Sequence, residues 1–131
     1  MKVHHIGHLV RDIEKAKVMF HALGFVNASE TYYDESRDID IVFLENDGYK
    51  VELVAPRSEK SVIWKHLKRS GSTPYHFCFS VHDIEKQIKI KEEEGYITLQ
   101  APSKAPAIAN RNVAFLYSPD IGIIELVEEV P

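Results

Sequence analysis

The sequence predicts an α+β fold made of two tandem βαβββ modules, which form a cupped mixed β-sheet with the helices on its outer face. The first observation behind this prediction is an internal repeat. Val10-Arg11-Asp12-Ile13-Glu14-Lys15 returns 71 positions later as Val81-His82-Asp83-Ile84-Glu85-Lys86. Val51-Glu52-Leu53-Val54 returns 73 positions later as Ile124-Glu125-Leu126-Val127. The second observation is size, because a module this small cannot cover both faces of its own sheet.

The first module, residues 1–56, begins with a short apolar strand at residues 4–10. Asp12 is suited to cap a helix, apolar residues follow it at helical spacing, and Gly24 ends that helix. Asn46-Asp47-Gly48 is typical of a hairpin turn. The other strands of this module are expected at residues 31–33, 39–44 and 50–54.

A linker, residues 57–73, follows and is expected to contain a short helix at residues 61–69. The second module, residues 74–131, repeats the order, with a strand at 75–81 and a helix that Asp83 caps and Gly95 ends. Residues 101–110 hold two prolines and four alanines and are expected to form a loop. The last strands are expected at residues 97–100, 113–117 and 123–128. The modules and linker together form one domain, residues 1–131.

Composition excludes several classes of function. The net charge of −4 provides no basic surface for nucleic acid. No apolar run is long enough to span a bilayer, and no signal-peptide core precedes the first strand. The single cysteine, Cys78, rules out a disulfide framework within the chain and a zinc cluster made of cysteines. We therefore expect a cytoplasmic protein with a small-molecule partner and no nucleic-acid or membrane partner.

Two glutamates occupy equivalent places in strands that are otherwise apolar. Because side chains alternate along a strand, Glu52 faces away from Val51 and Leu53. Glu125 faces away from its own apolar neighbours in the same way. A carboxylate in such surroundings is costly unless it is paired or bound to a metal ion.

Two histidines are equivalent in the same sense, since His5 and His76 are 71 positions apart. In the strand at residues 75–81, Phe77 and Phe79 suit packing against the helices, so His76 lies on the opposite, more polar face. The same alternation places His5 on that face of the first strand. The two histidines and the two glutamates can then share the concave face of the sheet.

Two imidazoles and two carboxylates form a donor set that suits Ni²⁺, Co²⁺ or Zn²⁺ and also Mn²⁺ or Fe²⁺. Such a site can keep two positions open for water or substrate. Duplication alone could also repeat these residues, with the glutamates in ion pairs at the sheet edge. The set of four favours one divalent metal ion bound by His5, Glu52, His76 and Glu125.

The chain resembles the vicinal oxygen chelate superfamily, in the branch that holds glyoxalase I and methylmalonyl-CoA epimerase. The residues that carry the resemblance are His5-Ile6-Gly7, Leu23-Gly24-Phe25, Tyr75-His76-Phe77, Asn112-Val113-Ala114-Phe115-Leu116 and Ile124-Glu125-Leu126. The resemblance implies the glyoxalase/bleomycin resistance/dioxygenase fold and places the family's metal ligands on His5, Glu52, His76 and Glu125. Together with the open edge strands of two small modules, it also implies a homodimer.

The implied activity is that of a metal-dependent lyase or isomerase that removes a proton next to the carbonyl of a small carbonyl compound or thioester. A divalent ion stabilises the enediolate, and a nearby carboxylate acts as the base. Glu125 is the first candidate for this catalytic base and Glu52 the second. A lyase of the glyoxalase I type, with one base, is slightly favoured. A racemising enzyme of the methylmalonyl-CoA epimerase type, with two bases on opposite faces, is the alternative.

Two other classes remain open. An extradiol-type dioxygenase needs two histidines and one carboxylate around Fe²⁺, so a fourth protein ligand argues against it. A metal-free protein that sequesters an antibiotic has no need for these four residues on one face.

Several further residues have a plain structural role and a functional alternative. Arg111 and the cluster Lys65-His66-Leu67-Lys68-Arg69 could hold an anionic group of the substrate, but solvated charges are favoured. Trp64 could pack within the fold or lie at an interface. Cys78 is expected to be a small buried hydrophobe. His8 stands where the family usually has an apolar residue, and a buried histidine with one satisfied nitrogen is favoured over a fifth ligand.

Overall fold

A computed structural model describes residues 1–130, which contain three α-helices, nine strands and one short 3-10 helix. The helices are α1 (Ile13–Ala22), α2 (Trp64–Ser70) and α3 (Ile84–Glu93), and the 3-10 helix is η1 (Pro106–Ile108). The strands are β1 (Lys2–Leu9), β2 (Val26–Asn27), β3 (Tyr32–Asp34), β4 (Ile39–Asn46), β5 (Tyr49–Pro56), β6 (Thr73–Val81), β7 (Ile97–Ala105), β8 (Arg111–Ser118) and β9 (Gly122–Glu128). The predicted mixed α+β class and the repeated βαβββ order are confirmed, with β2 as an additional short strand.

The chain forms two compact units. The first-module unit is Ile6–Pro74, and the second-module unit combines Met1–His5 with the segment that begins at Tyr75. Strand β1 therefore contributes to both units. The hydrogen-bonded strand order is β2-β4-β5-β1 in the first-module unit and β1-β6-β9-β8-β7 in the second, with β3 paired to β4.

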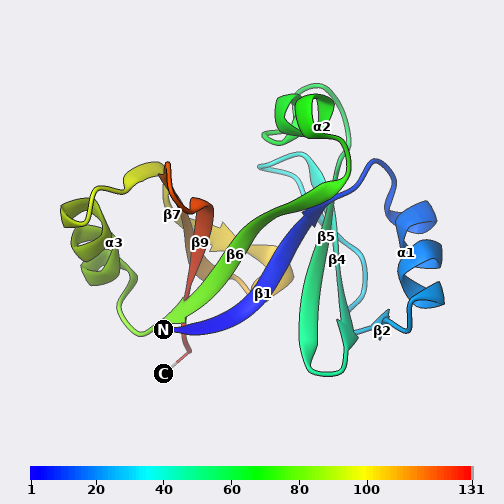
Figure 1. Ribbon diagram of the computed structural model, residues 1–131, viewed down its shortest axis with the longest axis horizontal. Coiled ribbons are helices and arrows are strands. Elements are labelled where there is room, and N and C mark those ends of the chain that lie inside the picture. The colour runs from blue at the N-terminus through cyan, green and yellow to red at the C-terminus, as the bar shows by residue number, and fades with distance from the viewer. Residues whose placement is uncertain (131) are drawn as a thin grey trace. The chain divides into compact units, whose positions relative to one another are not determined.

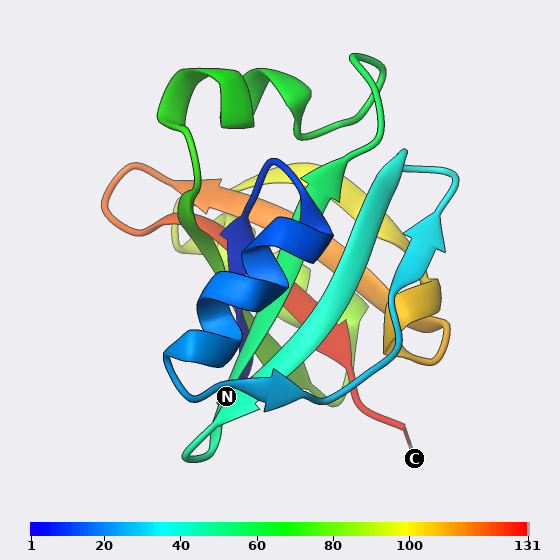
Figure 2. The same cartoon turned by 90° about the vertical axis from the view of Figure 1, so that its right-hand side faces the viewer.

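The core of the first-module unit lies between α1 and one face of β4 and β5. Figures 1 and 2 show α1 lying along these two strands. Strand β5 runs parallel to β1 and antiparallel to β4, so it is held on both sides. The buried side chains of this core are Val10, Ile13, Val42, Leu44, Val51, Leu53 and Ala55. Alternate residues of β5 therefore face the helix, as the sequence predicts.

The core of the second-module unit repeats this arrangement with α3 (Figure 1). Its buried side chains are Val81, Ile84, Ile88, Ala114, Leu116, Ile124 and Leu126, and Phe79 packs against them. The expectation for Phe77 is wrong, because 48% of its surface is exposed. Its ring centroid lies 6.3 Å from that of Phe79, so it extends the aromatic row outward rather than entering the core.

Helices α1 and α3 begin and end alike. The Asp12 carboxylate accepts a hydrogen bond from the Lys15 amide at 2.9 Å, and the Asp83 carboxylate accepts one from the Lys86 amide at 3.1 Å. These are N-caps that satisfy amides left without a partner in the first helical turn. Beyond the helix ends, Gly24 and Gly95 have φ angles of 99° and 100°. Residues with a Cβ rarely adopt that conformation, which explains glycine at both places.

The predicted hairpin turn joins β4 to β5. Asn46 pairs with Tyr49, so Asp47 and Gly48 alone form the loop. Their φ angles are 51° and 84°, and positive φ at both central residues defines the type I′ turn that matches the twist of the strands. The turn fixes the register in which Glu52 pairs with Phe43.

The prediction of a loop at residues 101–110 is wrong in its first half, because β7 continues to Ala105 before η1 begins. The pairing of β7 with β8 shifts register twice, between Thr98 and Gln100 and between Gln100 and Ser103. These irregularities accommodate Pro102, which lacks an amide hydrogen, and β7 is the last strand in its sheet order. An edge strand tolerates proline, so composition alone misleads here.

No helix within residues 1–130 combines the length and the apolar character needed to cross a bilayer.

Candidate metal centre

Three of the four predicted ligands come together within the second-module unit. His5 lies on β1, His76 on β6 and Glu125 on β9. Strands β6 and β9 are parallel, with Cys78 paired to Glu125. Ile124 and Leu126 belong to the core beside α3, so strand alternation directs Glu125 to the opposite face.

The three side chains present their metal-binding atoms at the spacing that a shared ion requires. His5 Nε2 lies 3.1 Å from Glu125 Oε1, and His76 Nε2 lies 3.0 Å from the same oxygen. The two Nε2 atoms are 3.4 Å apart. Atoms bound to one ion at about 2.1 Å lie about 3.0 Å apart at octahedral angles and about 3.4 Å apart at tetrahedral angles. The donor set therefore fits a divalent ion in both chemistry and spacing.

The cluster is shielded from water. His5, His76 and Glu125 are 1%, 4% and 3% exposed. The His76 ring meets the rings of Tyr75 and Phe115 edge-on, with centroids 4.4 Å and 5.4 Å away. Phe115 is also the residue that pairs with Glu125 across β8 and β9. Two aromatic side chains thus cover the His76 ring. The local dielectric constant in such a buried site is low, and this strengthens electrostatic interactions among the three residues.

The charge of Glu125 depends on its two neighbours. Burial alone raises the pKa of the Glu125 carboxyl, but the interactions with His5 and His76 outweigh burial and hold that pKa well below its usual value. The carboxylate is therefore ionised at neutral pH. This is the form in which a carboxylate binds a metal ion.

Glu52, the fourth predicted ligand, belongs to the first-module unit. It lies on β5, where it pairs with Gly7 of β1 and with Phe43 of β4. It is 5% exposed, and Val51 and Leu53 on either side belong to the core beside α1. Glu52 thus occupies the same place in its unit as Glu125 in the other. Its meeting with the other three ligands stays a prediction from the repeat.

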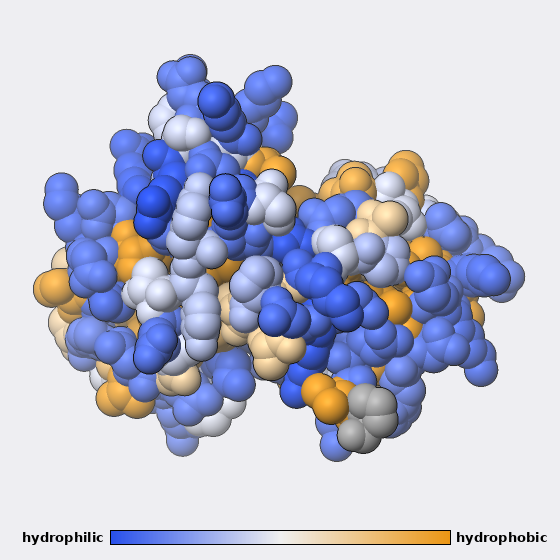
Figure 3. Space-filling model, turned by 180° about the vertical axis from the view of Figure 1, so that it is seen from behind, coloured by the Kyte–Doolittle hydropathy of each residue, from blue (hydrophilic) through white to orange (hydrophobic). Residues whose placement is uncertain are grey.

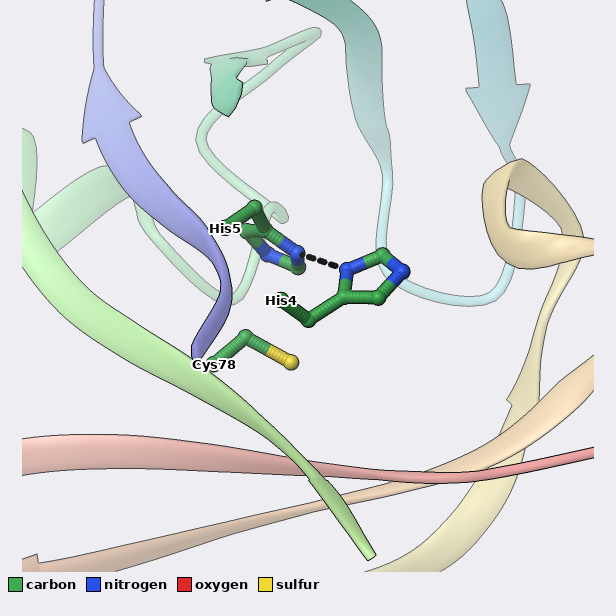
Figure 4. A group of neighbouring side chains, drawn as sticks. All are labelled: His4, His5 and Cys78. Carbon is green, nitrogen blue, oxygen red and sulfur yellow. Dashed lines mark hydrogen bonds between the residues drawn. The ribbon is translucent and has the colours of Figure 1, made fainter. Parts of the chain in front are cut away.

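His4 is a participant that the sequence reasoning did not identify. Its Nδ1 lies 2.8 Å from Nδ1 of His5, and Figure 4 shows the two rings joined by this contact, with Cys78 of β6 beside them. One ring nitrogen of each of His4 and His5 lies within 4.8 Å of the Cys78 sulfur. The only sequence signal is the density of histidines at residues 4–8. Cys78 itself is fully buried, as predicted.

His8 has the partnered nitrogen that the sequence favours, but it is half-buried rather than buried. Its Nδ1 lies 3.1 Å from the Leu9 carbonyl oxygen. Its ring meets the ring of Phe20 on α1 edge-on, with centroids 5.2 Å apart. His8 therefore points toward the helix side of β1. Burial lowers the pKa of His8, and the hydrogen bond with Leu9 raises it by less.

The other residues with a possible functional role in the sequence analysis differ in their exposure. Lys65, Lys68 and Arg69 of α2 are exposed, as a solvated helix face predicts. In the view from behind, the α2 region projects as a mostly hydrophilic knob (Figure 3). Trp64 is half-buried at the start of α2. Arg111 begins β8, and its Nε atom is buried and makes no hydrogen bond within residues 1–130.

Two sequence relatives span almost the whole chain. A Bacillus subtilis (strain 168) protein, "Uncharacterized protein YwkD", is 26% identical over 128 residues, which cover 97% of this chain and 96% of the relative. The mitochondrial methylmalonyl-CoA epimerase of Dictyostelium discoideum is 23% identical over 130 residues, which cover 98% of this chain and 78% of the relative.

Solved structures share the fold over similar lengths. The hypothetical protein BH1468 from Bacillus halodurans C-125 has a TM-score of 0.86 and 28% identity, with 99% of this chain and 95% of that chain covered. Methylmalonyl-CoA epimerase from Mycobacterium tuberculosis has a TM-score of 0.83 and 25% identity, with 98% and 88% covered. The Streptomyces coelicolor methylmalonyl-CoA epimerase in complex with 2-nitronate-propionyl-CoA has a TM-score of 0.83 and 21% identity, with 100% and 99% covered.

The sequence profile of one superfamily matches residues 4–115, a range that contains His5, Glu52 and His76. With the repeated modules and the buried histidine–glutamate cluster, this match identifies the chain as a member of the glyoxalase/bleomycin resistance protein/dioxygenase superfamily.

Proposed function

We propose that this protein is a metal-dependent isomerase of the epimerase type, which inverts a carbon next to the thioester carbonyl of an acyl-CoA. The observation that carries the proposal is the cluster of His5, His76 and Glu125, whose donor atoms lie 3.0–3.4 Å apart in a buried site. The sequence alone slightly favours a glyoxalase-type lyase. The named relatives, which include methylmalonyl-CoA epimerases, move the balance toward the isomerase.

The proposed ligands are His5, His76 and Glu125, with Glu52 as the fourth because of its equivalent place in the repeat. Ni²⁺, Co²⁺ and Zn²⁺ suit two imidazoles and two carboxylates. Such an ion would act as a Lewis acid toward the carbonyl oxygen of the substrate. The histidines must be neutral and Glu125 must be ionised to bind it, and the low pKa of Glu125 meets that need.

The proton transfers are assigned to the two glutamates. A carboxylate oxygen of Glu125 accepts the proton from the carbon next to the carbonyl, and the electron pair of the broken C–H bond remains on the substrate as an enolate. Inversion then requires a proton from the opposite face of the planar enolate. Glu52, in its protonated form, is proposed as the group that delivers it, because a duplicated module supplies an equivalent carboxyl group. Proton exchange with solvent then returns both glutamates to their starting forms. An enzyme with a single base would return the proton to the face of the enolate from which it was taken, and the configuration would not change.

The aromatic surroundings have a defined part in this chemistry. Tyr75 and Phe115 contact the His76 ring and limit access of water to the cluster. Exclusion of water strengthens the interaction between charged groups and a developing enolate.

A lyase of the glyoxalase I type remains the second candidate. The observation behind it is the donor set of two histidines and two glutamates, because this set suits a one-base lyase as well as a two-base epimerase. In that reaction one glutamate would take a proton from one carbon and return it to the neighbouring carbon.

The test is an exchange experiment on the metal-loaded protein. (2R)- and (2S)-methylmalonyl-CoA are each incubated in D₂O, and the configuration and deuterium content of the α-carbon are followed by NMR. An epimerase incorporates deuterium and interconverts the two configurations, and removal of metal with a chelator abolishes both. The hemithioacetal of methylglyoxal and glutathione is assayed in parallel. Turnover of that compound, with no exchange on either thioester, would replace the epimerase proposal by the lyase.

A further inference from the structure

The first-module unit contains a cavity of about 300 Å³ beside the linker helix. Its lining comes from three separate segments, which are the second residue after β1, the end of β5, and α2. The lining residues are Arg11, Pro56, Trp64, Leu67 and Lys68. The volume falls at the lower end of the range for small-ligand pockets.

The walls combine an apolar surface with positive charge. Trp64, Leu67 and Pro56 form the apolar part, and Arg11 and Lys68 are exposed cations at its margin. Within residues 1–130, neither cation makes a hydrogen bond or an ion pair. A flat aromatic group with phosphates matches this surface, since indole stacks on aromatic rings and both cations bind phosphate.

A neighbouring cavity of about 410 Å³ does not match in the same way. It shares Arg11 and Pro56 with the first cavity, but Asp12, Glu14 and Asp40 also line it. These carboxylates repel phosphate groups. The Arg57 guanidinium there is already paired with Asp40 at 3.2 Å. Charge complementarity therefore selects the cavity beside Trp64.

The position of this cavity relative to Glu52 suits a long substrate. Pro56 is the fourth residue after Glu52 on β5, about 13 Å further along the strand. Because residues two and four apart share a face, Glu52 and Pro56 lie on the same side of β5, opposite the core beside α1. An acyl-CoA has its thioester at one end and its nucleotide at the other, joined by an extended chain.

We propose that the cavity lined by Trp64, Arg11 and Lys68 binds the adenosine 3′-phosphate 5′-diphosphate end of a coenzyme A thioester. The adenine lies against Trp64, and the phosphates contact the two cations. This inference rests on the proposed function, because it supplies the substrate end that the metal cluster does not hold.

Trp64 also provides the measurement, because it is the one tryptophan in the sequence. Its fluorescence in the full zinc-loaded chain is followed during titration with coenzyme A, adenosine 3′,5′-bisphosphate, pantetheine and inorganic phosphate. Coenzyme A and the bisphosphate are expected to quench the emission, since both carry the adenine. Pantetheine and phosphate are expected to leave it nearly unchanged.

Charge variants test the contacts with phosphate. Arg11→Gln and Lys68→Gln are each expected to weaken coenzyme A about tenfold or more, because each removes a charge-assisted contact. The matched control is Lys65→Gln, which removes an exposed lysine from the same helix but does not line the cavity. That variant should bind coenzyme A as the original chain does.

The outcomes separate this inference from the proposed function. Quenching by pantetheine alone, or equal affinities in Lys65→Gln and Lys68→Gln, would overturn the nucleotide site. A thioester of pantetheine that is epimerised as efficiently as the coenzyme A ester would overturn it as well, and would leave the epimerase intact. Quenching by the bisphosphate in a chain that exchanges no α-proton would support the site and contradict the epimerase.

Discussion

The imidazoles of His4 and His5 meet through their Nδ1 atoms, 2.8 Å apart. One of these atoms must donate and the other accept. If Nε2 of His5 binds a metal ion, its Nδ1 carries the hydrogen and donates it to His4. Partners of this kind orient metal-binding histidines and fix their tautomer.

The first prediction is that His4→Ala weakens zinc binding by about 10- to 100-fold, the usual effect of losing such a partner. Binding is measured by competition with a chromophoric chelator, independently of turnover. His4→Gln should recover part of the affinity, because its amide oxygen can accept the same hydrogen. His82→Ala, which removes an exposed histidine, is the control. Equal affinities in the His4→Ala and His82→Ala variants would contradict the role of His4.

The second prediction concerns the catalytic base. Glu125→Gln keeps an oxygen for the metal ion but loses basicity, so turnover should fall by about two to four orders of magnitude. Metal content should fall much less than in His5→Ala. With Glu52→Gln, an epimerase should also lose inversion, while exchange of the α-proton continues from one face. Near-normal turnover in Glu125→Gln with metal bound would remove Glu125 from this role.

The third prediction concerns pH and stability. The folded-state pKa of His8 is lowered by burial, so the unfolded chain binds the proton more readily. The contribution of His8 to stability is therefore complete above the ordinary histidine pKa of about 6.5 and declines as pH falls below it. His8→Phe, which retains an aromatic contact with Phe20, should flatten the fall in stability between pH 7 and pH 5. Urea unfolding at several pH values measures this slope, and an unchanged slope would refute the assignment.

The fourth prediction tests the equivalence of the two cores. Leu53 and Leu126 occupy matching strand positions and are both 0% exposed. Leu53→Ala and Leu126→Ala should each lower the free energy of unfolding by about 2–5 kcal/mol, because each leaves a cavity. Leu23→Ala, at a position 71% exposed, should change it by less than about 0.5 kcal/mol. Urea denaturation provides the comparison, and a small effect at one leucine alone would show that the cores are not equivalent.

The fifth prediction is a homodimer. Strands β2 and β7 end the hydrogen-bonded orders of their units, and such edges favour pairing with another chain. Ile97 and Leu99 of β7 are 62% and 55% exposed, which adds apolar surface at that edge. Sedimentation velocity at micromolar concentration should give twice the mass of one chain. A single species of one chain's mass would count against it.

The repeat is the reason that so much of the fold could be predicted from the sequence. Asp12 and Asp83 cap helices, Gly24 and Gly95 end them, and alternation places Glu52 and Glu125 opposite their cores, since each follows from local chemistry. The extension of β7 through Pro102 could not be predicted, because it depends on where β8 offers partners and where the register shifts. Tertiary pairing overrides composition in such a segment.

The contact between His4 and His5 could not be predicted either. Alternation directs neighbouring strand residues to opposite faces, so two adjacent imidazoles are not expected to touch. Their meeting depends on side-chain conformations, which strand alternation does not specify. Strand alternation also fails to predict the exposure of Phe77. It gives the face of the sheet on which a residue lies, but not how far along the strand the covering helix extends.

Strand β1 divides between the two units, with Lys2–His5 in one and Ile6–Leu9 in the other. The duplicated halves are therefore not interchangeable building blocks once folded. A fragment that starts at Tyr75 would carry His76 and Glu125 but would lack both an edge strand and one imidazole, and a short peptide with the sequence of residues 1–9 would have to supply them in trans. The second half thus depends on the first for its completion, and separating the two into independent chains would leave that strand to be supplied from outside.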